Sequence, residues 1–208
     1  MELNTKEMFD YVEHILIQNG GLKSKKKHLG FRNRLEHTKR VYGWALKILP
    51  GVENCNKEMV LTAAIFHDVG YNNISNDEHA ALGAEIFLEY ASKHQMDEYF
   101  SSCVADLIRA HSNKDLLKLA DTPKELIILI EADLLDEEGA LGLVFDLLAE
   151  GYREPDSYKT VFNEIMIHSA HILDQDYMVT PLAKKFWEEK KELIRRFIDS
   201  LKKDLFME

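Results

Sequence analysis

The sequence predicts an all-α protein, a single-domain helical bundle, and three observations carry this prediction. Apolar residues recur at three- and four-residue intervals along most of the 208 residues, and no segment shows sustained period-two alternation. The sequence contains no internal repeat and no Gly/Ser-rich linker. Domains average roughly 150 residues, so the length suits one domain with an extension. We expect one domain over residues 1–208, with a motif-bearing core at about 32–142 and C-terminal helices at 156–206 packing on it.

Capping residues and glycines delimit the helices expected in the N-terminal half. Asn4 followed by Glu7 has the spacing of a capping box and begins a helix that stops at Gly20. Pro50 closes the next helix, and Gly70 closes the one after it. We expect the later helices at 32–49, 57–69, 76–94 with Asn76 as the cap, and 97–111.

The C-terminal half begins with the clearest helix start in the sequence. Thr122, Pro123 and Glu125 supply an N-cap, a first-turn proline and a capping-box acid for a helix that runs to about Asp136. Further helices are expected at 140–150, 158–172 and 180–206. The last one carries an apolar stripe, which we interpret as core packing rather than as a partner or membrane surface: Phe186, Leu193, Ile194, Phe197, Leu201 and Leu205.

The charge balance argues against a nucleic-acid partner. With 26 Lys and Arg against 36 Asp and Glu the net charge is −10, whereas proteins that bind nucleic acid normally present a basic face. We interpret the dense basic run, Lys23 and Lys25–Lys27, as a solvated loop. No apolar stretch approaches the roughly 20 residues that span a bilayer, and residues 1–10 lack the pattern of a signal peptide. We therefore expect a cytoplasmic protein with neither a nucleic-acid polymer nor a membrane as partner.

Polar residues lie on helix faces that should be apolar. His67 shares a helix face with Val60, Asp133 shares one with Leu129, and His37 faces the same way as the apolar residues one turn further on. An unpaired buried charge costs several kcal/mol, whereas a divalent cation satisfies imidazole nitrogens and carboxylate oxygens together. Each residue alone also suits a hydrogen-bonded core position, so the interpretation as a metal site depends on the combination.

The adjacent pair His67 and Asp68 adds a constraint on this site. Neighbouring side chains on a helix point about 100° apart, so both reach one ion only at a helix end. Gly70 ends the helix there. Together with His37 and Asp133 the pair offers two nitrogens and two oxygens, which suits Mn²⁺, Fe²⁺, Co²⁺, Ni²⁺ or Zn²⁺, with Mg²⁺ a further candidate. The two cysteines form no Cys-x-x-Cys pair, so neither a thiolate site nor a disulfide framework is expected.

These residues lie, in order, in the stretches "LEHTKRV", "AAIFHDVGY" and "LIEADLLDEEGALG". The ordered set resembles the HD-domain superfamily of metal-dependent phosphohydrolases, over about residues 34–142. "EADLLDEEGALG" is most similar to the small, stand-alone bacterial members. The resemblance implies the HD-type helical fold and assigns the metal ligands to His37, His67, Asp68 and Asp133.

Two further segments match the family. "EHAALGAEIF" with His79 and "IRAHS" with His111 are similar to segments whose histidines, in the family, bind a second metal or face the substrate phosphate. We therefore expect one or two divalent ions, with His79 and His111 lining the same cleft. A helix-terminal histidine with one hydrogen bond is the simpler alternative for each.

The sequence departs from the family pattern at two positions. Tyr71 stands where many dinuclear members have Lys, and Asn72 stands where nucleotidase-like members have an acid. The general acid is therefore left open. Asp136, Glu137 and Glu138 are substitutes in principle, although acids at a helix end are more often solvated.

The resemblance implies a phosphohydrolase. Four protein ligands leave coordination positions open, and a water bound there has a lowered pKa. Asp68 is a candidate catalytic residue, and Arg40 and Arg109 are the basic residues nearest the motifs that can stabilise charge on a phosphate. We expect cleavage of a phosphomonoester or pyrophosphate bond in a small phosphorylated metabolite, with nucleotides among the candidates. The alternatives are an HD-type di-iron oxygenase and a non-catalytic, metal-stabilised signalling or ligand-binding domain.

Overall fold

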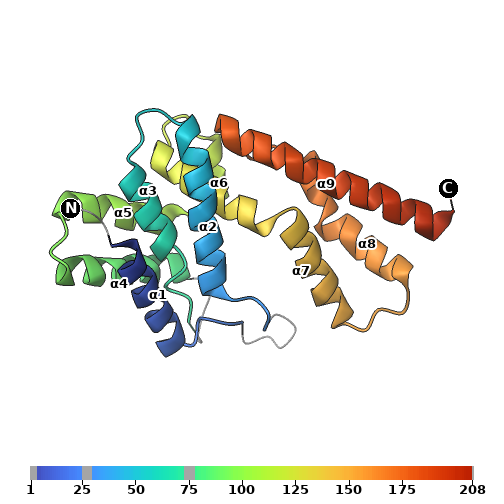
Figure 1. Cartoon of the computed structure of the whole chain (residues 1–208), viewed down its shortest axis with the longest axis horizontal. Helices are drawn as coiled ribbons and strands as arrows, with labels where there is room; N and C mark the ends of the chain where they lie inside the picture. Colours follow the sequence, from blue (N-terminus) through green and yellow to red (C-terminus); the bar gives the residue numbers. More distant parts are fainter. Residues whose placement is uncertain (1–3, 25–29, 73–77, 208) are drawn as a thin grey trace.

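The computed structural model describes residues 4–24, 30–72 and 78–207, and in these ranges the protein is all-α, as predicted (Figure 1). The described ranges contain no strand, and their one isolated bridge pairs Lys23 with Asn33. None of the helices in them combines the length and the apolar content needed to cross a membrane.

The helices α1 to α6 form one half of the molecule, with α2 and α6 side by side and α4 paired with α5 (Figure 1). Side-chain oxygens of Asn4, Asn33, Asn56 and Asp97 accept a first-turn N–H and so fix four of the helix starts. The elements are α1 (Thr5–Gln18), α2 (Arg34–Ile48), η2 (Leu49–Gly51), α3 (Lys57–Phe66), α4 (His79–Lys93), α5 (Glu98–Ala110), η3 (Lys114–Lys118) and α6 (Lys124–Glu137).

The second half extends from α6 along the long axis, so that the two chain termini lie at opposite ends of the molecule (Figure 1). It consists of α7 (Ala140–Gly151), α8 (Tyr158–His168), the short 3₁₀ helix η4 (Ala170–Asp174) and α9 (Pro181–Phe206). The long helix α9 contacts both halves, because it packs on α2 and α6 as well as on α7, α8 and η4.

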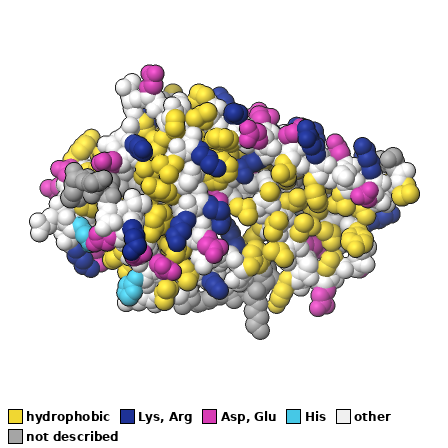
Figure 2. All heavy atoms as spheres, viewed as in Figure 1, with side chains coloured by type: hydrophobic (Ala, Val, Ile, Leu, Met, Phe, Trp, Pro, Cys, Tyr) yellow, Lys and Arg dark blue, Asp and Glu magenta, His cyan; other side chains and the backbone are white. Residues whose placement is uncertain are grey.

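The core runs through both halves. Phe66, Phe87 and Ile108 are fully buried in the first half, and Trp187 and Ile194 of α9 are buried in the second. Part of the predicted α9 stripe therefore packs in the core, although Leu193 stays 42% exposed. Hydrophobic side chains also gather on the surface of the second half (Figure 2), where α7, its C-cap residue and α8 expose Leu141, Val144, Leu148, Tyr152, Met166 and Ile167.

Several predicted boundaries are wrong by part of a turn or more. Helix α3 ends at Phe66 rather than at 69, and α8 ends at His168, after which the chain continues as η4. The predicted start of α2 at Arg32 is two residues early, since Asn33 is the cap. The predicted cap Asn76 lies outside the described residues, as do Lys25–Lys27 of the basic run.

The predicted capping box at the start of α6 is also wrong. Pro123 occupies the cap position, and no side chain caps the helix there. The Thr122 hydroxyl donates instead to the carbonyl of Leu116, and the Glu125 carboxylate accepts the N–H of Asn56 at 2.7 Å. Contacts with neighbouring elements have replaced the local capping interactions that the spacing suggested.

Candidate metal centre

The His67–Asp68 pair lies at the C-terminal end of α3, where the chain turns at once. The Val69 N–H donates to the carbonyl of Phe66, and the Tyr71 N–H donates to that of Asp68. Gly70 packs directly on the first turn of α4, since a Cβ at this position would lie 2.1 Å from the His79 carbonyl oxygen. The absence of a side chain at residue 70 therefore lets α4 bring His79 up to this turn.

A first group of metal-ligand atoms joins α2, the end of α3 and α6. The Nε2 atoms of His37 and His67 are 3.2 Å apart. Asp133 Oδ1 lies 3.2 Å from the Nε2 of His37 and 3.9 Å from that of His67. Both histidines are buried, and the Asp133 side chain is only 14% exposed. These three side chains present ligand atoms close enough together to hold one metal ion.

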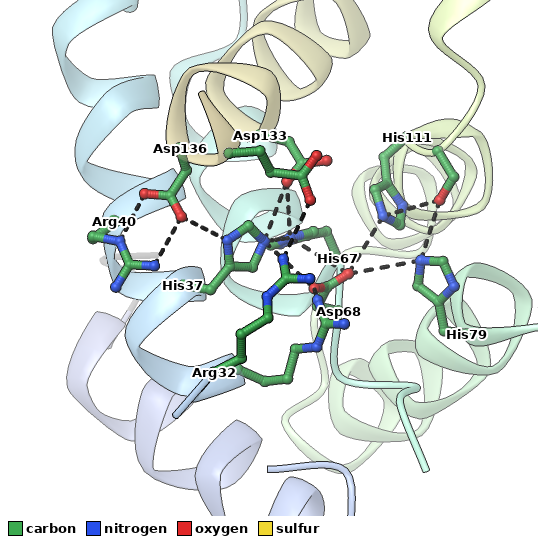
Figure 3. Close-up of polar contacts among 12 residues, drawn as sticks. Arg32, His37, Arg40, His67, Asp68, His79, His111, Asp133 and Asp136 are labelled. Carbon is green, nitrogen blue, oxygen red and sulfur yellow. Dashed lines mark hydrogen bonds and ion pairs between the residues drawn. The ribbon is translucent and has the colours of Figure 1, made fainter. Parts of the chain in front are cut away.

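A second group shares His67 with the first and adds Asp68 and His111 of α5. Asp68 Oδ1 lies 3.6 Å from the Nε2 atoms of both His67 and His111, and 3.7 Å from that of His79. Asp68 Oδ2 lies 3.4 Å from the Nε2 of His37, so the carboxylate sits between the two groups (Figure 3). The structure thus brings together all six residues predicted as metal or phosphate ligands.

Hydrogen bonds at the outer ring nitrogens orient the rings of His67 and His111. His67 Nδ1 donates to the Ala64 carbonyl at 2.9 Å, and His111 Nδ1 donates to that of Ile108 at 2.7 Å. A carbonyl oxygen only accepts, so Nδ1 carries the proton and the Nε2 lone pair points into the cluster. Burial lowers the pKa of His67 to about 4, which keeps this ring neutral near pH 7. Converging lone pairs and carboxylates are the donor set of a divalent cation, so the residues present fit a metal ion.

The carboxylates of the cluster stabilise positive charge beside them. Burial acts to raise the pKa of Asp133, but the hydrogen bond with His37 outweighs it and holds the value at about 2. Burial acts to lower the pKa of His37, yet its hydrogen bonds with Asp133 and Asp136 raise it to about 10. The Asp133–His37 contact contributes to both shifts, because it stabilises the ionised carboxylate and the protonated ring together. The carboxylates of Asp68, Asp133 and Asp136 thus stabilise a positive charge at the buried His37 ring.

Asp136 is an inward-facing partner of the cluster rather than a solvated acid. It is 3% exposed, and its carboxylate lies 2.7 Å from His37 Nδ1 and accepts from Arg40 at 2.7 and 3.0 Å. The expectation that acids after Asp133 are solvated is therefore wrong for this residue. Asp136 follows Asp133 by three residues and so shares its helix face, a signal already present in the sequence. Glu137, in contrast, pairs at 3.5 Å with Arg32 near the surface.

The arginine closest to the cluster differs from the predicted ones. Arg34 Nη1 donates to Asp68 Oδ2 at 2.9 Å, and its position three residues before His37 places it on the same face of α2. Arg109 does not reach the cluster. Its guanidinium pairs with Asp106 at 2.8 Å on the surface, and it lines a separate groove between α4 and α5. Arg40 reaches the site through Asp136.

A cavity of about 430 Å³ adjoins the cluster and is formed by α2, α6, α7 and the region around η4. His37 and Asp136 form part of its wall on the cluster side. The rest of the wall is partly aromatic and mixed in charge. It contains Phe31 and Phe145, whose ring centroids are 5.9 Å apart, and the acidic residues Glu36, Glu137, Glu138 and Asp146. The basic lining residues are Arg32, Arg34, Arg40, His168 and His171.

Comparisons with known proteins agree with the all-α fold. The family model described as the HD domain matches residues 34–138. The structure of an HD-superfamily hydrolase from Bacillus thuringiensis superposes with a TM-score of 0.71 at 19% identity, covering 98% of this chain and 97% of that one. A "predicted HD superfamily hydrolase" from an uncultured Thermotogales bacterium gives 0.64 at 21% identity, covering 96% and 92%. YpgQ of Bacillus subtilis in complex with ADP gives 0.64 at 19% identity, covering 97% of both. At these identities the structural likeness shows a shared fold.

Proposed function

The chain belongs to the HD-domain superfamily, and from this premise we propose that it is a metal-dependent phosphohydrolase. The reaction is hydrolysis of a phosphomonoester or pyrophosphate bond in a small phosphorylated metabolite. The observation that carries the proposal is the convergence of imidazole Nε2 atoms and carboxylates on a buried cluster that opens onto a cavity with arginines in its wall.

Each residue has a role that follows from its position. His37, His67, Asp68 and Asp133 would hold the metal, and His79 and His111 would bind either a second ion or the substrate phosphate. A divalent ion bound there supplies a Lewis acid and activates water for attack on phosphorus. Arg34 and Arg40 lie between the cluster and the cavity, where a guanidinium can bind the non-bridging oxygens of a phosphate.

The cavity favours a substrate that carries an apolar or aromatic group beside its phosphate. Phe31 and Phe145 offer ring faces, and the arginines offer positive charge within the same 430 Å³. A nucleotide combines these features, and a fold relative, YpgQ, binds ADP. A protein with net charge −10 repels a polyanion in general, so a small phosphorylated compound that reaches the arginines of the cavity suits this site better than a nucleic-acid polymer.

Metal content tests the ligand assignment. Protein reconstituted with Mn²⁺ and then desalted should retain the metal, whereas Asp68→Ala should lose it, because this carboxylate contacts both ligand groups. Asp106→Ala is the matched control, since Asp106 is an exposed residue of α5 whose carboxylate pairs with Arg109 on the surface. Equal metal in wild type and Asp68→Ala would contradict the assignment.

Turnover tests the reaction itself. The Mn²⁺- or Mg²⁺-loaded protein should release phosphate or pyrophosphate from members of a panel of nucleotides, sugar phosphates and aryl phosphates, and chelation should abolish the release. Activity on nucleotides above sugar phosphates is expected from the aromatic wall. A metal-loaded protein that cleaves no member of the panel would contradict the proposed function.

A further inference from the structure

Tyr71 follows the His67–Asp68 turn and contacts two residues of the site at once. The guanidinium carbon of Arg34 lies 3.6 Å from the centre of the Tyr71 ring. The ring of His79 stacks on it as well, with centroids 4.3 Å apart and planes 22° apart. The Tyr71 side chain therefore supports one residue from α2 and one from α4.

These two neighbours face different oxygens of the same carboxylate. Arg34 donates to Asp68 Oδ2 at 2.9 Å, while His79 Nε2 lies 3.7 Å from Asp68 Oδ1. His79 Nε2 also lies 3.2 Å from the hydroxyl of Ser112, which is 3.2 Å from His111 Nε2. A movement of the Tyr71 ring would thus release groups on both sides of Asp68.

The backbone holds Tyr71 in place independently of these ring contacts. Its N–H donates to the Asp68 carbonyl at 3.2 Å. The segment after α1 packs closely against the backbone of Tyr71. A Cβ on Gly21 would lie 2.0 Å from the Tyr71 carbonyl oxygen. The ring is half-buried, and an aromatic side chain with two rotatable angles loses little entropy when it is fixed as a support.

We propose that Tyr71 is a positioning residue that holds Arg34 and His79 in place to bind the substrate phosphate beside Asp68. Arg34 lines the cavity as well as contacting Asp68, so its guanidinium stands between the carboxylate and the substrate space. A guanidinium stacked on an aromatic face keeps its edge N–H groups available for oxygen ligands. The identification of the ligand as a phosphate rests on the proposed function, whereas the support of Arg34 by Tyr71 does not.

Binding of inorganic phosphate to the Mn²⁺-loaded full chain, measured by calorimetry, tests this role. Tyr71→Phe keeps the ring and should bind phosphate within about twofold of wild type. Tyr71→Leu removes the ring face and should weaken binding about 2- to 30-fold, the range of a cation–π contact expressed as affinity. Arg34→Lys keeps the charge but loses the planar group and should weaken binding similarly. The double variant should lose less affinity than the product of the two single effects, because both changes remove the Tyr71–Arg34 contact.

Tyr90 offers the matched control. Its ring stacks on His94 at 3.9 Å and 25°, a similar tyrosine–histidine pair at the opposite end of α4 from His79. Tyr90→Leu should lower stability and leave phosphate affinity unchanged.

Three results would overturn the role of Tyr71. The first is that Tyr71→Leu binds phosphate as tightly as the wild type does. The second is that the loss of affinity in the double variant equals the product of the losses in Tyr71→Leu and Arg34→Lys, and the third is that the wild type binds no phosphate. If Tyr71→Leu does not fold, wild-type affinity in Arg34→Lys overturns the role instead. Wild-type protein that binds phosphate but hydrolyses no member of the substrate panel would contradict the proposed function and leave the role of Tyr71 standing.

Discussion

The histidines of the cluster differ in what holds their outer ring nitrogen. His67 and His111 donate to backbone carbonyls, whereas His37 Nδ1 lies 2.7 Å from the Asp136 carboxylate. A carboxylate partner makes the opposite nitrogen more basic and fixes the ring orientation more firmly than a carbonyl does. Arg40 in turn donates to Asp136. The orientation of His37 therefore depends on Asp136 of α6 and, through it, on Arg40 of α2.

Asp136→Asn should therefore weaken metal binding although Asp136 is not among the predicted ligands. The amide keeps the volume but removes the charge behind His37, and loss of such a partner typically reduces metal affinity about 10- to 100-fold. Competition with a chromogenic chelator measures the change. Glu137→Gln is the control at the next position, because Glu137 pairs near the surface with Arg32 and Lys114. Equal affinities in the two variants would contradict the role of Asp136.

Helical periodicity was sufficient to predict that His37, His67 and Asp133 face inward. Asp68 was inferred from its place beside His67 at a helix end, and His79 and His111 were inferred from the resemblance to the HD-domain superfamily. Their roles as ligands remain predictions. The Arg34–Asp68 pair could not be predicted in the same way, since it depends on how α2 crosses the end of α3. Arg109 was chosen for its closeness to His111 in sequence, yet helical positions two residues apart face different directions, and its side chain points to the surface.

At the scale of elements, the approach of α4 to the end of α3 sets the position of His79. Gly70 permits this approach, because a Cβ there would lie 2.1 Å from the His79 carbonyl oxygen and 2.4 Å from the Gly83 nitrogen. Both atoms belong to backbone, so neither can yield without moving α4.

Gly70→Ala should destabilise the protein by about 2 kcal/mol or more, as overpacking against backbone does. Gly43→Ala is the matched opposite case. Gly43 lies inside α2, and a Cβ there would meet no other element of the described residues within 4 Å. Alanine at this position should therefore stabilise by about 0.5–1 kcal/mol through helix propensity. Urea unfolding compares the two variants, and a stability change of the same sign in both would contradict the steric argument.

The joint between α6 and α9 depends on a buried acid that the sequence did not reveal. Glu131 is fully buried, and its carboxylate accepts from the N–H groups of Val179 and Thr180 and from the Thr180 hydroxyl, the last at 2.6 Å. Thr180 is the residue that precedes α9. The carboxylate therefore satisfies donors where α9 begins, and it ties this helix to α6.

Glu131→Ala should lower the free energy of unfolding by about 3 kcal/mol, because it leaves buried donors without an acceptor. Glu131→Gln should cost less, since the amide oxygen can accept the same N–H groups and the Thr180 hydroxyl can rotate to accept from the amide. Glu125→Ala, which removes one contact with the exposed Asn56 N–H, should cost less than about 1 kcal/mol. Chemical unfolding gives all three values, and an equal cost for Ala at 125 and 131 would contradict the assignment.

At the scale of the whole molecule, the ligand cluster and α9 connect elements that are far apart in the sequence. The cluster joins α2, the end of α3, α5 and α6, and α9 joins that half to α7 and α8. The all-α class followed from periodicity alone and is confirmed. The cavity between the halves could not be predicted from periodicity, because its wall combines Phe31 with residues of α7. We propose that residues 1–208 unfold as one domain.

This proposal predicts that metal binding in one half stabilises the other. The Trp44→Phe variant leaves Trp187, which is buried in α9, as the fluorescent reporter. The Trp187 indole N–H donates a hydrogen bond to the Gln175 carbonyl, which is not part of the cluster. Mn²⁺ at about 100 times its Kd should add about 2.7 kcal/mol to the free energy of unfolding. If the chain is one cooperative unit, the Trp187 transition shifts by the same amount as the far-UV circular dichroism. Asp68→Ala in the same background should show no shift. If Mn²⁺ shifts the unfolding midpoint measured by circular dichroism but leaves the midpoint measured by Trp187 fluorescence unchanged, the two halves unfold separately.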